Sequence, residues 1–122
     1  MTRSIRIAPP NSYILVADVL RHDQLPDFTT QARIDGTKFC VAVGCEVDLD
    51  GETDITIGPA PDVDPGNRPV FDTILETPNR KVTVWTIEVE KLLEEKVAAD
   101  RTRVRIWGNR PEFPDRVVIG LG

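Results

Sequence analysis

The chain has 122 residues, a formal net charge of −5 and 40% hydrophobic residues, a balance typical of one folded domain and not of a disordered chain. The acidic balance argues against nucleic-acid binding over the whole surface, because phosphates would be repelled. No stretch approaches the roughly 20 consecutive apolar residues of a membrane span, and the first residues lack the apolar run of a secretory signal. We therefore expect one cytoplasmic domain over residues 1–122, with no direct nucleic-acid partner and no membrane partner.

Alternating apolar residues predict strands along most of the chain. The first long run, residues 13–20, is apolar on both faces, which is typical of a strand buried on two sides. Turn signals separate the runs, among them Asp50-Gly51 and the four prolines of residues 59–69, which we expect to form a loop with neither helix nor inner strand. The pattern predicts an all-β fold, a single-domain antiparallel β-sandwich of seven or eight strands. The further predicted strands are residues 39–48, 54–57, 71–76, 82–89, 102–107 and 117–121.

Residues 89–99 fit two structures. Val89, Leu92, Leu93 and Val97 follow the spacing i, i+3, i+4, i+8, with charged residues between them. This spacing predicts one short helix with a single apolar face. The same residues also fit a β-ribbon that ends in a loop, and both structures stay open at this stage.

The two cysteines, Cys40 and Cys45, predict no disulfide and no metal site. Residues five apart in one strand point to opposite faces, so a bridge between them is unfavourable. We expect two reduced thiols that serve as inert core of an intracellular protein. The single histidine, His22, adds no second ligand pair for zinc. Because nothing supplies the orienting third group for a cysteine–histidine pair, we predict no enzyme, no catalytic residue and no cofactor.

Negative charge is concentrated in the middle of the chain. Residues 46–76 contain nine acids and one base, a net charge of −8 that leaves +3 for the remainder. Exposed acids often serve only solubility, and a calcium loop is a poor match because Gly51 stands fourth, not sixth, after Asp48. A dense carboxylate patch can also imitate the phosphate backbone and occupy the basic cleft of a nuclease. The candidate partner-binding residues are Glu46, Asp48, Asp50, Glu52, Asp54, Asp62, Asp64 and Asp72.

A secondary candidate patch lies near the C-terminus. Arg103, Arg105 and Trp107 share one face if residues 102–107 are extended. Such a strip can stack on bases or pair with carboxylates. It is equally consistent with a solvated edge strand protected from aggregation, or with internal pairing to the acidic segment.

Strands and one polar stretch follow one another over most of the chain. The segments are Ser12-Tyr13-Ile14-Leu15-Val16, the polar stretch from Thr29 to Gly36, the strand from Phe39, Glu76-Thr77-Pro78-Asn79-Arg80-Lys81-Val82 and Arg103-Val104-Arg105-Ile106-Trp107. This order resembles that of the small bacterial competence protein J group, whose known member is a nuclease inhibitor, while the segments 59–69 and 89–99 match no feature of that family. The resemblance implies a non-enzymatic inhibitor or immunity-type protein with a protein partner. The alternatives are a module that binds a small ligand or a divalent metal through the same carboxylates, and a structural homo-oligomer with apolar strand faces buried between subunits.

Overall fold

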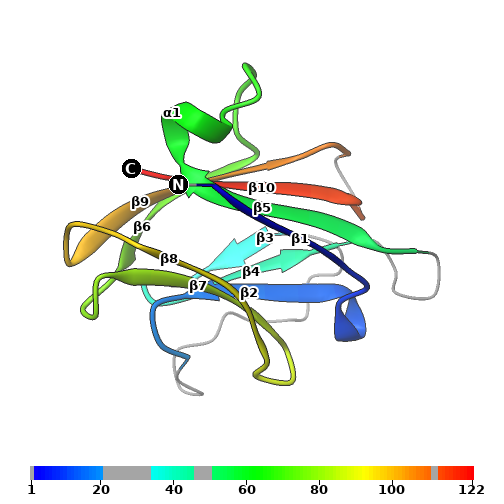
Figure 1. Ribbon diagram of the computed structural model, residues 1–122, viewed down its shortest axis with the longest axis horizontal. Helices are drawn as coiled ribbons and strands as arrows, with labels where there is room; N and C mark the ends of the chain where they lie inside the picture. Colours follow the sequence, from blue (N-terminus) through cyan, green and yellow to red (C-terminus); the bar gives the residue numbers. More distant parts are fainter. Residues whose placement is uncertain (1, 21–33, 46–50, 111–112) are drawn as a thin grey trace.

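Two five-stranded sheets pack face to face as a β-sandwich (Figure 1). The computed structural model describes residues 2–20, 34–45, 51–110 and 113–122. The strands are β1 (Arg3–Ile7), β2 (Tyr13–Ala17), β3 (Ile34–Gly36), β4 (Val41–Gly44), β5 (Thr53–Pro59), β6 (Phe71–Glu76), β7 (Lys81–Thr86), β8 (Lys91–Lys96), β9 (Arg101–Gly108) and β10 (Arg116–Leu121). The helices are the 3-10 turn η1 (Pro10–Ser12) and the single turn α1 (Ala60–Val63).

Sheet A has the strand order β1-β5-β10-β9-β6, and sheet B has the order β3-β4-β2-β7-β8. The predicted β-sandwich is confirmed. Sheet B is antiparallel throughout, whereas sheet A is mixed because β5 and β10 run parallel, with Ile55 opposite Val117. The predicted number of strands, seven or eight, is too low for the described residues, which form ten. The three-residue strand β3 is too short to show alternation in the sequence.

Inward-facing residues of both sheets form the main core. Their alternation with polar residues along β5 and β9 is the period of two that an extended chain imposes. Each fully buried valine, leucine or isoleucine contributes about 1.5–3 kcal/mol relative to an exposed one, so this layer holds the two sheets together. The fully buried aliphatic residues of the layer are Ile14, Val16, Val41, Val43, Ile55, Ile57, Leu75, Val82, Val84, Val104, Ile106, Val117 and Ile119.

A second apolar cluster lies on the outer face of sheet B, around Leu15 and Ala42. The strand β2 is therefore buried on both faces, as its sequence predicts. Cys40 belongs to this outer cluster and Cys45 to the main core, and both thiols are free. Burial raises the pKa of each thiol to about 12, which keeps both protonated at neutral pH.

Residues 91–96 form the strand β8 and not a helix, which confirms the β-ribbon and shows the helical alternative to be wrong. A β-bulge explains why the sequence shows a helical spacing here. Val84 pairs with Leu93 and Trp85 pairs with Lys91, so Leu92 is an extra residue on this strand. Leu92 and Leu93 can therefore both pack against the core. The bulge interrupts the period of two and imitates a helical spacing.

The proline segment 59–69 differs from the expected loop at its start. Pro59 still belongs to β5, and α1 follows immediately with Pro61 in its first turn. Proline is tolerated there because the first turn of a helix leaves its N–H groups without an intrahelical partner. Figure 1 shows α1 at one end of sheet A. Within the described ranges no helix has the length and apolar character needed to cross a membrane.

Candidate functional site

The structure does not gather the predicted carboxylates into one face. Glu52 and Asp54 lie at the start of β5, Asp62 and Asp64 follow its end, and Asp72 lies on β6. The seven residues of β5 span about 20 Å at the usual rise of a strand. The described carboxylates therefore fall in three separate places. The remaining candidates, Glu46, Asp48 and Asp50, lie outside the described residues.

Arg6 forms ion pairs with the carboxylates of Glu52 and Asp54 at the start of β5. It lies opposite Asp54 in the pairing of β1 with β5. Its Nε is 3.3 Å from Glu52 Oε1 and its Nη1 is 3.4 Å from Asp54 Oδ2. These exposed pairs add little to stability, but they offset the negative charge that a basic partner would need.

Asp72 is paired with an arginine of the neighbouring strand β9. Arg103 donates from Nε to Asp72 Oδ1 at 3.0 Å and from Nη2 to Oδ2 at 2.6 Å. Arg101 also forms an ion pair across the same two strands, with its Nε 3.1 Å from Glu76 Oε2. This confirms internal pairing with the acidic segment, one of the three explanations for the arginine strip.

Replacing Asp72 by asparagine should remove a pH-dependent part of the stability. The hydrogen bond from Arg103, with the charges of Arg103 and Arg105, holds the pKa of Asp72 below its ordinary value. A lowered pKa in the folded state stabilises the fold above the ordinary value, and that stabilisation is lost as the pH falls through the folded-state pKa. The Tm difference between wild type and Asp72→Asn should be present at neutral pH and shrink as the pH falls below the ordinary range of a carboxyl group.

The matched control is Asp62→Asn, because Asp62 forms no ion pair with a described residue. At neutral pH it should lower the Tm less than Asp72→Asn does in the same series of thermal melts. If the Tm of the wild type exceeds that of Asp72→Asn by the same amount down to the lowest pH, the role assigned to the ion pair is wrong.

Arg105 and Trp107 share a face of β9 with Arg103, as predicted, but neither is free to bind. Arg105 donates from Nη2 to the Gly122 carbonyl at 2.6 Å. The side chain of Trp107 is buried, with the residue only 3% exposed. Trp107 therefore cannot stack on a ligand without leaving its place, whereas Arg103 of the same predicted patch stays exposed while it pairs with Asp72.

Trp107 instead anchors the connection between β5 and β6. Its Nε1 donates to the backbone carbonyl of Asn67 at 2.8 Å. Its ring lies over Gly120 and beside Ala60 of α1: a Cβ on Gly120 would lie 2.8 Å from Trp107 Cζ3 and 3.2 Å from Ala60 Cα. The absence of a side chain at Gly120 is what allows the indole, β10 and α1 to meet.

We call residues 60–70, which the indole holds in place, the anchored loop. Asp64 donates its N–H to the Ala60 carbonyl at 3.0 Å, and its Oδ1 accepts the N–H of Gly66 at 2.7 Å. Gly66 has a φ of 95°, a conformation that favours glycine. At the far end, Val70 donates to the Ile106 carbonyl at 2.8 Å. Hydrogen bonds at both ends and in the middle thus fix the backbone of the anchored loop.

Two carboxylates of the anchored loop remain available. Asp62 and Asp64 are exposed, and neither forms an ion pair with a described residue. They differ in structural role, since Asp64 supports the turn at Gly66 whereas the side chain of Asp62 makes no hydrogen bond within the described part. Of the five predicted partner-binding residues that the structure describes, these two are the ones that are exposed and form no ion pair.

The described residues show no cluster of metal-ligating side chains. No group of three or more His, Cys, Asp or Glu side chains is placed to hold a metal ion in the described ranges. Both thiols are buried and protonated, and His22 lies outside the described residues. The class that fold and site define is a β-sandwich that presents a fixed loop with two exposed aspartates and one exposed arginine, Arg68.

Comparisons with protein-family models, with curated proteins and with solved structures find no match to this chain. The resemblance to the competence protein J group therefore stays a prediction.

Proposed function

We propose that this chain is a non-enzymatic protein-binding domain that presents the anchored loop to a basic surface of its partner. The observation that carries the proposal is the hydrogen bond and packing of Trp107, which fix the loop while Asp62 and Asp64 stay exposed. A loop held in its binding conformation loses less conformational entropy on association than a flexible loop. Its carboxylates would speed and orient the encounter with a cationic partner.

The charge distribution favours the anchored loop, and not the rest of sheet A, as the surface that binds the partner. On the outer face of the sheet, the carboxylates of Asp54 and Asp72 already face arginines of the same chain. A partner would have to displace these arginines to gain the carboxylates, whereas Asp62 and Asp64 carry no such cost. The partner class that the competence protein J resemblance implies is a nuclease, whose substrate-binding cleft is basic.

Reversing the charge at position 62 should weaken partner binding and leave the fold unchanged. We expect the wild-type chain to inhibit at least one enzyme in a panel of basic bacterial DNA nucleases, measured by hydrolysis of a fluorescent DNA duplex. Asp62→Lys should raise the inhibition constant at least tenfold, because it replaces attraction by repulsion at a rigid contact. Asp64→Asn, which keeps the Oδ1 acceptor for Gly66, should weaken inhibition less.

The matched control is Asp54→Lys, which reverses a carboxylate at the opposite end of β5. It should inhibit the nuclease as the wild type does. The protein-binding proposal for the anchored loop is wrong if Asp62→Lys and the wild type inhibit equally, or if position 54 matters more than position 62. The nuclease assignment is wrong if the wild type inhibits no member of the panel.

A further inference from the structure

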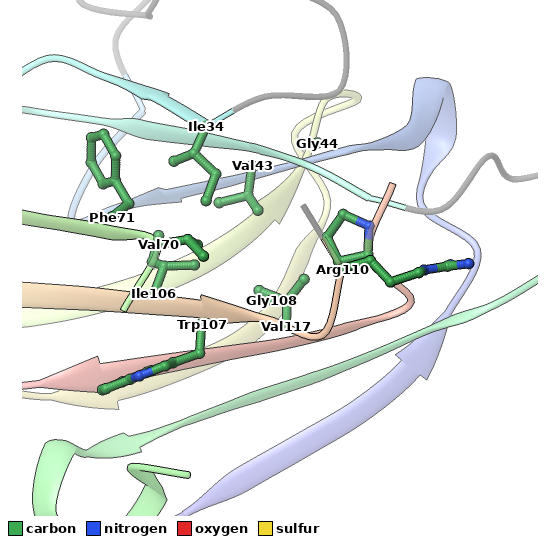
Figure 2. A pocket seen from close by; sticks show the side chains of 11 residues that line it. Ile34, Val43, Gly44, Val70, Phe71, Ile106, Trp107, Gly108, Arg110 and Val117 are labelled. Atoms are coloured by element: carbon green, nitrogen blue, oxygen red, sulfur yellow. The ribbon is translucent and has the colours of Figure 1, made fainter. Parts of the chain in front are cut away.

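A cavity of about 200 Å³ opens at one end of the core, between the inner face of sheet A and the β3–β4 edge of sheet B (Figure 2). Ile34 and Val43 line it from sheet B, and Phe71, Ile106 and Val117 line it from sheet A. In Figure 2 the side chains of Ile34 and Val43 point toward those of sheet A across the space. The cavity thus opens at the end of the sandwich and extends between the two sheets.

Apart from Arg110, the described side chains that line the space are apolar. Val43, Ile106 and Val117 are fully buried, and Ile34 and Phe71 pack against the same core. Arg110 borders the cavity, but its side chain extends away from it in Figure 2. Its Nη2 donates to the Phe113 carbonyl at 2.8 Å and lies 3.7 Å from Asp115 Oδ2.

This lining decides what the cavity can hold. A charged ligand would lose its hydration without meeting an opposite charge, which is costly. Among the described lining residues, water would find no polar side chain except Arg110, so it is held weakly against the apolar side chains and can be displaced from them. An apolar ligand would regain the dispersion contacts that the lining atoms lack. The cavity therefore favours a neutral apolar molecule.

The volume and the lining of the cavity limit the size and the chemical type of the ligand further. An engineered apolar cavity of about 150 Å³ is large enough for benzene, so about 200 Å³ accommodates a substituted ring or two fused rings. Phe71 offers a ring for edge-to-face contact. A Cβ on Gly36 would lie 3.1 Å from Phe71 Cζ, so close packing against β3 holds this ring in place.

We infer that the cavity is a binding site for a small neutral aromatic molecule of one or two fused rings. This site rests on the core geometry and not on the anchored loop, so it stands or falls independently of the proposed protein partner. Binding would use the burial of apolar surface and would select neutral over ionised forms of the same ligand.

The test is a titration of the whole chain with indole and toluene, followed by methyl NMR and thermal melts. We expect saturable shifts of the methyl signals of Ile34, Val43, Ile106 and Val117, and a Tm that rises with ligand concentration. Benzoate, a charged ring of similar size, should produce neither effect. The inference is overturned if indole and toluene give no saturable shifts, if benzoate binds as well, or if the shifts map elsewhere.

Two substitutions with opposite effects locate the ligand. Val43→Phe places a ring in the cavity and should weaken indole binding at least tenfold. Val117→Ala enlarges the cavity and should favour indole over toluene more strongly than the wild type does. The control is Val104→Ala, a buried position on β9 that does not line the cavity, which should lower the Tm without changing the Kd for indole.

These variants keep the test decisive if one of them fails to fold. Unchanged indole affinity in Val43→Phe would overturn the assignment. If Val43→Phe does not fold, the comparison of Val117→Ala with Val104→Ala decides, and an equal ligand preference in the two variants would overturn it.

Discussion

Replacing Trp107 by alanine should lower the free energy of unfolding by about 3–5 kcal/mol, the usual cost of removing a buried tryptophan. The side chain is 3% exposed, so its loss leaves a cavity between β10 and α1. It also removes the 2.8 Å hydrogen bond to the Asn67 carbonyl. Equilibrium denaturation in urea measures the loss. Trp107→Phe, which keeps most of the ring but not the N–H, should cost about 1 kcal/mol from the hydrogen bond plus a smaller packing loss.

Hydrogen exchange separates loosening of the anchored loop from general destabilisation. In Trp107→Ala the amides of Asp64 and Gly66 should exchange faster than global unfolding alone predicts. The control is Trp85→Ala on sheet B, where the indole is half-buried and donates to the Ala17 carbonyl at 3.4 Å. This variant should leave the exchange of the loop amides unchanged relative to global stability. A Trp107→Ala variant with unaltered loop exchange would refute the anchoring role.

The strands could be predicted because their signal is local. Alternation with a period of two marks β6 and β10 at nearly their observed bounds, and the two-sided apolar run marks β2 as an inner strand. The same geometry correctly places Cys40 and Cys45 on opposite faces. Each of these predictions needs only neighbours in the sequence, which is why each is confirmed.

Features that depend on pairing between strands could not be predicted from the sequence. The bulge opposite Val84 and Trp85 makes β8 look helical, because the extra residue on one strand is defined only by its partner. The parallel pairing of β5 with β10 joins segments about 60 residues apart and leaves no local mark on either strand. The short turn α1 was hidden because proline normally argues against a helix.

In the candidate site, too, local features could be predicted from the sequence, whereas contacts between distant residues could not. Counting charges along the chain finds the acidic segment, but it cannot show that Arg6 offsets Asp54 across two strands or that Arg103 offsets Asp72. The anchoring role of Trp107 depends on meeting the Asn67 carbonyl and Gly120 in space. A tryptophan among arginines therefore suggested a binding strip, whereas the structure uses the indole to hold a loop.

Gly120→Ala should lower the free energy of unfolding by about 1–3 kcal/mol, the usual cost of overpacking a filled site. The new Cβ would lie 2.8 Å from Trp107 Cζ3 and 3.2 Å from Ala60 Cα, so either the indole or α1 must move. Gly108→Ala on the neighbouring strand is the matched control. There the nearest atom, Pro114 Cβ, would lie 3.3 Å away, and a smaller loss is expected.

A double-mutant cycle with Trp107→Leu tests whether the indole is the obstacle to a side chain at position 120. Leucine has no atom that reaches as far as Cζ3 of the indole, so Gly120→Ala should cost much less in the Trp107→Leu background. The coupling energy, measured by urea denaturation of the four proteins, should fall in the range of about 0.5–3 kcal/mol typical of contacting residues. Strictly additive losses would mean that α1, and not the indole, excludes a side chain at Gly120, and that the close contact of β10 with Trp107 does not set the position of the loop.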